Sequence, residues 1–315
     1  MPATPSHKKK SFVWIPGVGP SAAALTNLRE TTHIPSTVPG EAWFMGERRR
    51  MYDEFFEYSP LEIPKKVLCE FLWEASSGTS SFSEDLDEVE NWRSWFRYLL
   101  PTLIIRGDEK DCFNFLIEAV ITAFFSIYRN GWTSEHAEFR ENILDTLGTA
   151  IMMPSLWDVQ GESITAQGED WSVQRGPACD GALSASLFFC LSYLKRSEVA
   201  AWTESLLTID SAFFRAHFLT WLAGSYEILA KGVCSFREIE KAPFEVQWEN
   251  SFLLDQLPPT ISNANRQIFL SSLKANLTTE RLCEWLDDIA QYPPLYEPLS
   301  MAGIAETVND VVLAK

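Results

Sequence analysis

The spacing closest to a known cofactor pattern lies near the beginning of the chain, in FVWIPGVGPSAAAL at residues 12–25. Gly17 begins a Gly-x-Gly-x-x-Ala pattern, and glycines at this spacing let the pyrophosphate of a dinucleotide approach a helix N-terminus. That chemistry also needs strands on both sides of the helix. Pro16 and Pro20 stiffen the turn instead, and no alternation of strands and helices follows. We therefore predict no bound cofactor here and expect the glycines to supply a bend.

The same segment carries an apolar anchor formed by Phe12, Trp14 and Ile15. It lies in residues 1–45, a proline-punctuated basic arm that we expect to be partly irregular and to precede an acidic helical domain at 46–315. The first fifty residues carry a net charge of +4, which leaves −21 for the rest of a chain of net charge −17. Because opposite charges attract, we hypothesise that the anchor packs on the acidic body or on a partner.

A second group with chemical potential consists of the carboxylates Asp85, Asp87 and Glu88, followed by Asn91. It resembles the aspartate-rich motif of class I terpenoid cyclases, and the resemblance implies an all-α enzyme that holds magnesium and a diphosphate in an aromatic-lined cavity. The second metal motif of that family, Asn/Asp-x-x-x-Ser-x-x-x-Glu, has no match in this chain. We interpret the cluster as a solvated acidic helix start, which the helix dipole favours, and predict no metal site.

Histidine and cysteine chemistry is sparse. The four histidines include no pair at metal-ligand spacing, and the six cysteines lie far apart without a Cys-x-x-Cys motif. Neither a Gly-x-Ser-x-Gly elbow nor a phosphate-binding loop of the Walker type occurs. His217 and Trp221 share an aromatic helical segment, and we expect them to lie in the core or to line a groove.

Two basic runs are candidates for partner docking or nuclear targeting: residues 8–10 and the arginines Arg48, Arg49 and Arg50. The simpler interpretation is a solvated arm, with the arginines also paired to the acidic segment at 51–58. We favour that interpretation.

Composition limits the function classes. A chain with 46% hydrophobic residues can form a core, whereas a net charge of −17 argues against nucleic-acid binding because phosphates are repelled. The longest apolar run, residues 113–128, contains Asn114 and Glu118 and is too short to span a bilayer. With no recognisable signal peptide, we expect a cytoplasmic protein, with the nucleus as the alternative.

Helices must position all of these residues. Residues 59–62 (SPLE) are typical of a helix start, with Ser59 as the cap and Glu62 closing a capping box. Apolar residues at helical spacing follow from Trp92 to Leu103. Further helices are predicted at about 109–128, 135–153, 180–194, 197–208, 211–231, 262–275, 278–290 and 300–313. One β-hairpin is predicted near 163–174, so the fold class is all-α.

Two segments, about 92–128 and 198–231, resemble the paired helices of HEAT and armadillo-like repeats. The first has a turn at Asp108 and Pro101 inside its first helix, where we expect a kink. The second has Asp210 at its turn and Arg215 soon after. The resemblance implies antiparallel helix pairs in a HEAT-like array; an irregular helical bundle is the alternative.

Together these patterns favour a non-enzymatic scaffold that binds a protein or peptide through an acidic, aromatic-bearing surface. An all-α enzyme or small-ligand binder with an apolar cavity, similar to a terpenoid cyclase, is the alternative. The interaction candidates are Phe12, Trp14, Ile15, Arg48, Arg49, Arg50, Asp85, Asp87, Glu88, His217 and Trp221.

Overall fold

The fold is known from a computed structural model of the chain. It describes residues 11–39, 42–44, 47–49, 52–77, 86–111, 114–128, 140–153, 181–225, 227–231, 248, 261–293, 296 and 303–313. These residues are predominantly helical, as the periodicity predicts. The predicted hairpin at 163–174 lies outside the described residues.

The helices form two groups along the chain. The first contains α1 Ala22–Glu30, α2 Glu54–Glu57, α3 Lys65–Ser77, α5 Leu86–Ile105, α6 Leu116–Ile127 and α7 Arg140–Leu144. The second contains α9 Gly181–Tyr193, α10 Val199–Leu207, α11 Ala212–Gly224, α12 Asn263–Asn276, α13 Thr279–Ala290 and α15 Ile304–Leu313. A 3-10 helix, η2 Leu147–Met152, follows α7, and a π-helical turn, η3 Glu227–Lys231, follows α11.

Strand structure among the described residues is limited to two short antiparallel pairs. Strands β1 Ala42–Phe44 and β2 Glu47–Arg49 pair with Trp43 opposite Arg48. Strands β3 Lys110–Asp111 and β4 Asn114–Phe115 pair just before α6. The predicted helix at 109–128 therefore begins seven residues later than expected, at Leu116, because this tight ladder occupies its first turns.

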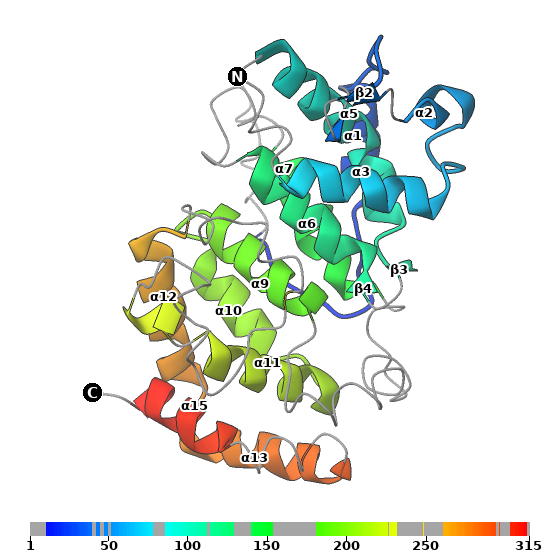
Figure 1. The fold of residues 1–315 in the computed structure, drawn as a ribbon. Coiled ribbons are helices and arrows are strands. Elements are labelled where there is room, and N and C mark those ends of the chain that lie inside the picture. The colour runs from blue at the N-terminus through cyan, green and yellow to red at the C-terminus, as the bar shows by residue number, and fades with distance from the viewer. Residues whose placement is uncertain are drawn as a thin grey trace, which may run out of the picture.

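Helix α6 is the central element of the first group. It packs against α3, α5 and α9, and eleven of its twelve residues are buried. A helix with apolar side chains on all faces has no side to present to water, so it is stable only between other helices. Figure 1 shows α3 and α6 crossing one another, with α1, α2 and α5 at one end of the molecule and α13 and α15 at the other.

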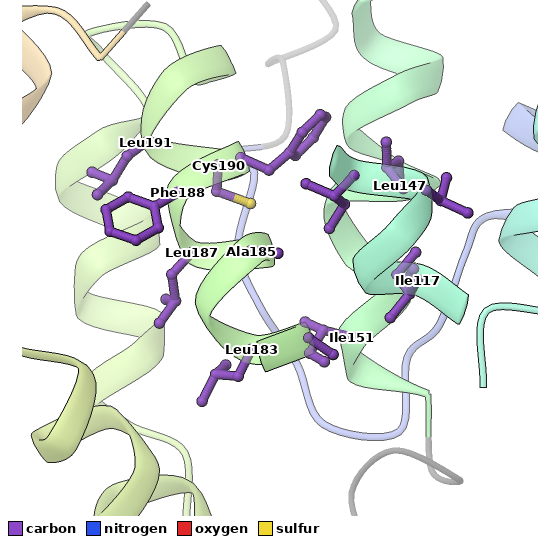
Figure 2. Packing of buried hydrophobic residues seen from close by; sticks show 14 of the residues in the cluster. Ile117, Leu147, Ile151, Leu183, Ala185, Leu187, Phe188, Cys190 and Leu191 are labelled. Carbon is purple, nitrogen blue, oxygen red and sulfur yellow. The ribbon is translucent and has the colours of Figure 1, made fainter. Parts of the chain in front are cut away.

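Helix α9 joins the two groups because it is buried on nearly all sides, the small Ser184 and Ser186 included. Figure 2 shows Cys190 and Ala185 on the side of α9 that faces Leu147 of η2, whereas Leu187 and Leu191 point the opposite way. All five side chains are completely buried in one continuous core. The described core therefore continues from one helical group to the other through α9.

Side chains from distant helices satisfy the free carbonyl groups at helix C-termini. Arg140 donates to the carbonyl of Tyr193, the last residue of α9. The Asn265 amide donates to the carbonyls of Leu191 and Leu194, both at 2.9 Å. These carbonyls have no partner within their own helix, so each bond fixes the position of one helix against another.

The predicted helix start at residues 59–62 is wrong. The Ser59 hydroxyl donates to the Glu62 carboxylate at 2.6 Å, and the Glu62 N–H donates to the Ser59 carbonyl at 2.8 Å, so the segment forms a closed turn. Helix α3 begins only at Lys65, after Pro64. The capping-box residues are present, but their side chains bond one another instead of the backbone.

The packed helix pairs do not follow the order expected for a HEAT-like array, which is not confirmed. Helices α5 and α6 pack together, as predicted for residues 92–128. Helix α10, however, packs mainly on α12, and α11 packs mainly on α13 and α15. Helix α5 runs through Pro101 to its end at Ile105. Among the described helices, none is both long and apolar enough to cross a membrane.

Candidate functional site

The N-terminal arm is held in the core by Phe12 and Trp14, which are both buried. The Trp14 backbone N–H donates to the Ser205 hydroxyl at 2.9 Å, and the indole N–H donates to the Gly148 carbonyl at 2.8 Å. The Trp14 ring also meets the Trp202 ring edge-on at 5.5 Å. One residue of the arm therefore connects η2 with α10, across the boundary between the two helical groups.

The glycine-rich turn that follows has a structural role. Val18 N–H donates to the Ile15 carbonyl at 3.1 Å, and Gly17 has a φ of +78°, as required at the third position of a type II turn. A Cβ on Gly19 would lie 2.9 Å from the Met153 side chain. Ile15 is 46% exposed, so it lies outside the buried anchor. The glycines serve a bend and a close approach, as the prolines indicate.

The arm also contacts the beginning of α5, where the acidic cluster was recognised. The Asn91 amide donates to the Val38 carbonyl at 2.6 Å, and the Trp95 indole donates to the Thr37 carbonyl at 2.5 Å. Glu90 pairs with Arg97 at 3.2 Å. Asn91, the neutral member of the cyclase-like cluster, therefore binds the backbone of the arm.

Several of the sequence candidates fall at the margin of the described structure. Asp85 and Arg50 lie outside the described residues, and only the backbone is described for Asp87 and Glu88 at the start of α5. Only the backbone is described likewise for Arg48 and Arg49 in β2. Within the described part of the chain, no group of three or more His, Cys, Asp or Glu side chains is arranged to hold a metal ion.

His217 and Trp221 of α11 are buried in the core. The Trp221 ring lies 5.3 Å from the Phe188 ring and 5.9 Å from the Phe269 ring, so it connects α11 with α9 and α12. In this conformation the two side chains contribute to packing and are covered by neighbouring helices.

A different segment, residues 52–77, carries exposed aromatic and apolar side chains among acidic residues. Phe56, Tyr58 and Leu61 are 46%, 44% and 56% exposed, and Trp73 on α3 is half exposed. Residues 52–77 contain six Asp or Glu and only two Lys. We call the exposed side chains of residues 53–74 the α2–α3 surface. Exposed large apolar side chains are a feature of docking sites.

The geometry of this surface follows from one buried residue, Phe55. Its ring contacts the rings of Phe71 at 5.3 Å and Trp95 at 4.9 Å, which anchors the single turn of α2 on α3 and α5. Successive residues of a helix point about 100° apart. Phe56 therefore lies at the rim, with its ring 5.4 Å from that of Trp95. The tight Ser59–Glu62 turn then presents Leu61 to solvent.

Tyr52, just before α2, is buried, and three carboxylates act on its phenol. Burial raises the pKa of the Tyr52 phenol far above its ordinary value, and the negative charges of Glu74, Glu70 and Glu54 raise it further. The phenol therefore stays neutral, and the three carboxylates lie close enough to act on one hydroxyl. The α2–α3 surface combines apolar rings with a negative potential.

Sequence reasoning did not single out the α2–α3 surface. It treated residues 51–58 only as a counter-charge for the arginine run. The signal was nevertheless present in two adjacent phenylalanines inside an acidic segment, because a short helix cannot bury both.

Comparisons with known proteins identify no relative for this arrangement. No family model, no curated protein and no solved structure matches the chain.

Proposed function

We propose that this protein is a non-enzymatic helical scaffold whose α2–α3 surface binds a basic, apolar segment of a partner protein. The observation that carries the proposal is the exposure of Phe56, Tyr58 and Leu61 in a segment rich in carboxylates. Aromatic side chains supply most of the contact energy at protein interfaces, and complementary charge accelerates association and selects the partner.

The partner chemistry follows from the charge of the surface. Six acidic residues against two lysines leave residues 52–77 with a net charge of −4, which repels phosphates and acidic peptides. In a peptide with Lys or Arg flanking Leu or Phe, the basic side chains pair with the carboxylates and the apolar side chains pack on the rings. Nucleic acid is excluded from the proposal on the same electrostatic ground.

Cysteine usage supports placing this function in a reducing compartment, the cytoplasm or the nucleus. The described cysteines Cys190 and Cys283 are free thiols, and a secreted protein commonly pairs its cysteines. Burial raises the pKa of the Cys190 thiol well above its ordinary value, so this thiol is inert.

The proposal is tested with a labelled twelve-residue peptide of alternating Lys and Leu, whose dissociation constant for the full chain is measured by fluorescence anisotropy. A Glu–Leu peptide of the same length serves as the charge control. We expect saturable binding of the basic peptide only. The double variant Tyr58→Ser/Leu61→Ser should weaken binding about thirtyfold, because truncating hot-spot side chains costs about 1 kcal/mol each.

A matched pair of charge reversals localises the site. Glu57→Lys lies on the α2–α3 surface, and Glu284→Lys makes the same change on an exposed residue of α13. We expect the first to weaken binding severalfold and the second to leave it nearly unchanged, at equal net charge. Equal effects of the two variants, or equal binding of the acidic and basic peptides, would overturn the proposal.

A further inference from the structure

A groove of about 580 Å³ runs along the outer side of α12, away from the α2–α3 surface. Eight of its ten lining residues belong to α12, from Asn263 to Asn276, and Arg196 and Glu204 complete it from the side of α10. Thirteen helical steps of 1.5 Å make it about 20 Å long. That length accommodates about six residues of extended chain at 3.3 Å each.

The lining is unusual for an exposed helix of an acidic protein. On α12 it consists of side chains that both donate and accept hydrogen bonds, such as Asn263, Gln267 and Ser271, and of small apolar residues such as Ala264 and Ala275. Asn263 is partly engaged, because its amide oxygen accepts from Arg266 at 3.0 Å. Gln267, Ser271 and Ala275 are exposed. Exposed helical faces ordinarily display charged residues, whereas every α12 residue in this groove is neutral.

The chemistry of the lining selects among ligand classes. Among the described residues that line the groove there is no aromatic ring to stack on a sugar or base. Arg196 is the one cationic side chain among them, and a single positive charge does not balance the charges of a nucleotide phosphate chain. A peptide backbone presents alternating N–H and C=O groups, which neutral amides and hydroxyls satisfy in either direction. Small side chains leave room for the backbone to approach the helix.

The two helices give the groove a direction. At one end, Asn265 bonds the carbonyls of Leu191 and Leu194, just before Arg196 and α10. At the other end, Arg281 donates to the Leu207 carbonyl at 2.7 Å and to the Asn276 carbonyl at 3.3 Å. Helices α10 and α12 therefore run in the same direction, with both N-termini at the Arg196 end. Their aligned dipoles and the guanidinium make that end positive, and Glu204 lies farther along α10.

We propose that the α10–α12 groove binds an extended peptide segment of about six residues that carries a carboxylate at the Arg196 end. Glu204 repels an acidic side chain farther along and accepts a basic one there. This ligand differs in charge pattern from the basic segment proposed for the α2–α3 surface, and it is recognised mainly through its backbone. The two sites therefore predict two distinct bound segments for one chain.

The test uses an array of octapeptides with neutral cores of Ser, Ala and Thr, which carry Glu, Gln or Lys at either end. Affinity for the full chain is measured by fluorescence anisotropy. We expect peptides with one terminal Glu to bind at least fivefold more tightly than their Lys counterparts. Arg196→Glu should invert this preference, because it reverses the charge at that end. An unchanged preference in Arg196→Glu would overturn the proposal.

A matched pair on α12 tests the location. Ser271→Trp places a large ring in the groove, and Lys274→Trp places the same ring on an exposed residue of α12 that does not line it. We expect at least a tenfold loss of octapeptide affinity in the first variant and less than a twofold change in the second. Equal behaviour of the two would overturn the assignment. Tyr58→Ser/Leu61→Ser should leave octapeptide binding unchanged, so failure here is distinguishable from failure of the scaffold proposal.

Discussion

Two partly buried arginines, Arg106 and Arg215, stabilise the two helical groups in different ways. Arg106 directly follows α5. Its guanidinium donates two hydrogen bonds, of 2.7 and 2.8 Å, to the carboxylate of Glu109, three residues away. It also donates to the Ile63 carbonyl at 2.5 Å. Arg215 pairs with Asp210 at 2.9 Å and with Asp288 of α13, and its guanidinium lies 5.5 Å from the Trp285 ring centre.

The Arg106–Glu109 and Arg215–Asp288 ion pairs differ in sequence separation, which is three residues in the first and seventy-three in the second. The Arg106–Glu109 pair forms wherever that turn forms, and it chiefly fixes the entry into α6. The Arg215–Asp288 pair exists only after α11 has packed on α13, seventy-three residues later in the chain. A sequence pattern can therefore reveal the first kind of contact, whereas the second depends on the assembled fold.

Alkaline pH should have the largest effect, and should act on both helical groups, through Tyr52 in the first and Tyr193 in the second. Burial strongly raises the pKa of Tyr52 and Tyr193, so both phenols are neutral when folded. Their contribution is complete below about pH 10, where the unfolded phenols are also neutral. It is lost as pH rises above 10, because only the unfolded chain then releases the protons. At pH 11 the loss is about 1.4 kcal/mol for each.

Urea unfolding at pH 8 and pH 11 measures this loss. Among the described residues, the Tyr52 hydroxyl has no hydrogen-bond partner, so Tyr52→Phe should cost little at pH 8. It should also remove about 1.4 kcal/mol of the loss at pH 11. An alkaline loss of the same size in Tyr52→Phe would contradict the assignment.

Arg215→Ala should lower the free energy of unfolding by about 2 kcal/mol, because it removes two carboxylate partners and the contact with Trp285. Urea unfolding at pH 8 measures it. Arg215→Lys keeps the charge but loses the planar fork, and should recover less than half of the stability. Since arginine stays charged, the effect should be equal at pH 8 and pH 11; a smaller effect at pH 11 would be evidence against this account.

Arg106→Ala should cost about 1 kcal/mol, less than Arg215→Ala. Glu109 is partly exposed and can turn to water when its partner is lost, whereas the Ile63 carbonyl loses a donor. The same urea experiment compares the two variants. If Arg106→Ala lowered the free energy of unfolding more than Arg215→Ala, the contacts of Arg106 would be the stronger ones.

Asp210→Asn should have the smallest effect, less than about 0.5 kcal/mol, because the Asp210 side chain is 94% exposed and water screens its pair. Asp288→Asn should cost more, since its side chain is less exposed. A double-mutant cycle between Arg215 and each aspartate measures the two coupling energies. If the Asp210 coupling proved the larger one, the turn rather than the α11–α13 contact would be the important interaction.

The helices of the second group could be predicted within one or two residues at most boundaries. The predicted ranges 197–208, 262–275 and 278–290 correspond to α10, α12 and α13. Ser262 and Thr278 cap α12 and α13 by accepting a backbone N–H three residues on. Caps and 3.6-residue periodicity are local properties, so the sequence contains them directly.

The sequence-based predictions of helix starts were wrong where a polar group had two possible hydrogen-bond partners. The Ser59 hydroxyl donates to the Glu62 carboxylate instead of accepting a hydrogen bond from a backbone N–H. At residues 110–115 the backbone of an apolar segment paired with itself in β3 and β4 before becoming helical. Each outcome depends on the helices packed around the segment, which propensity does not encode.

By itself, the amino-acid sequence determined the helical class, most of the helices after residue 181, and the acidic charge. It also indicated the bend at Gly17. Only the tertiary structure decided that Phe55 is buried while Phe56 is exposed, which creates the α2–α3 surface. It alone placed α10 beside α12 to form the groove. The physical reason is that periodicity specifies which face of a helix avoids water, whereas the choice of covering helix depends on long-range packing.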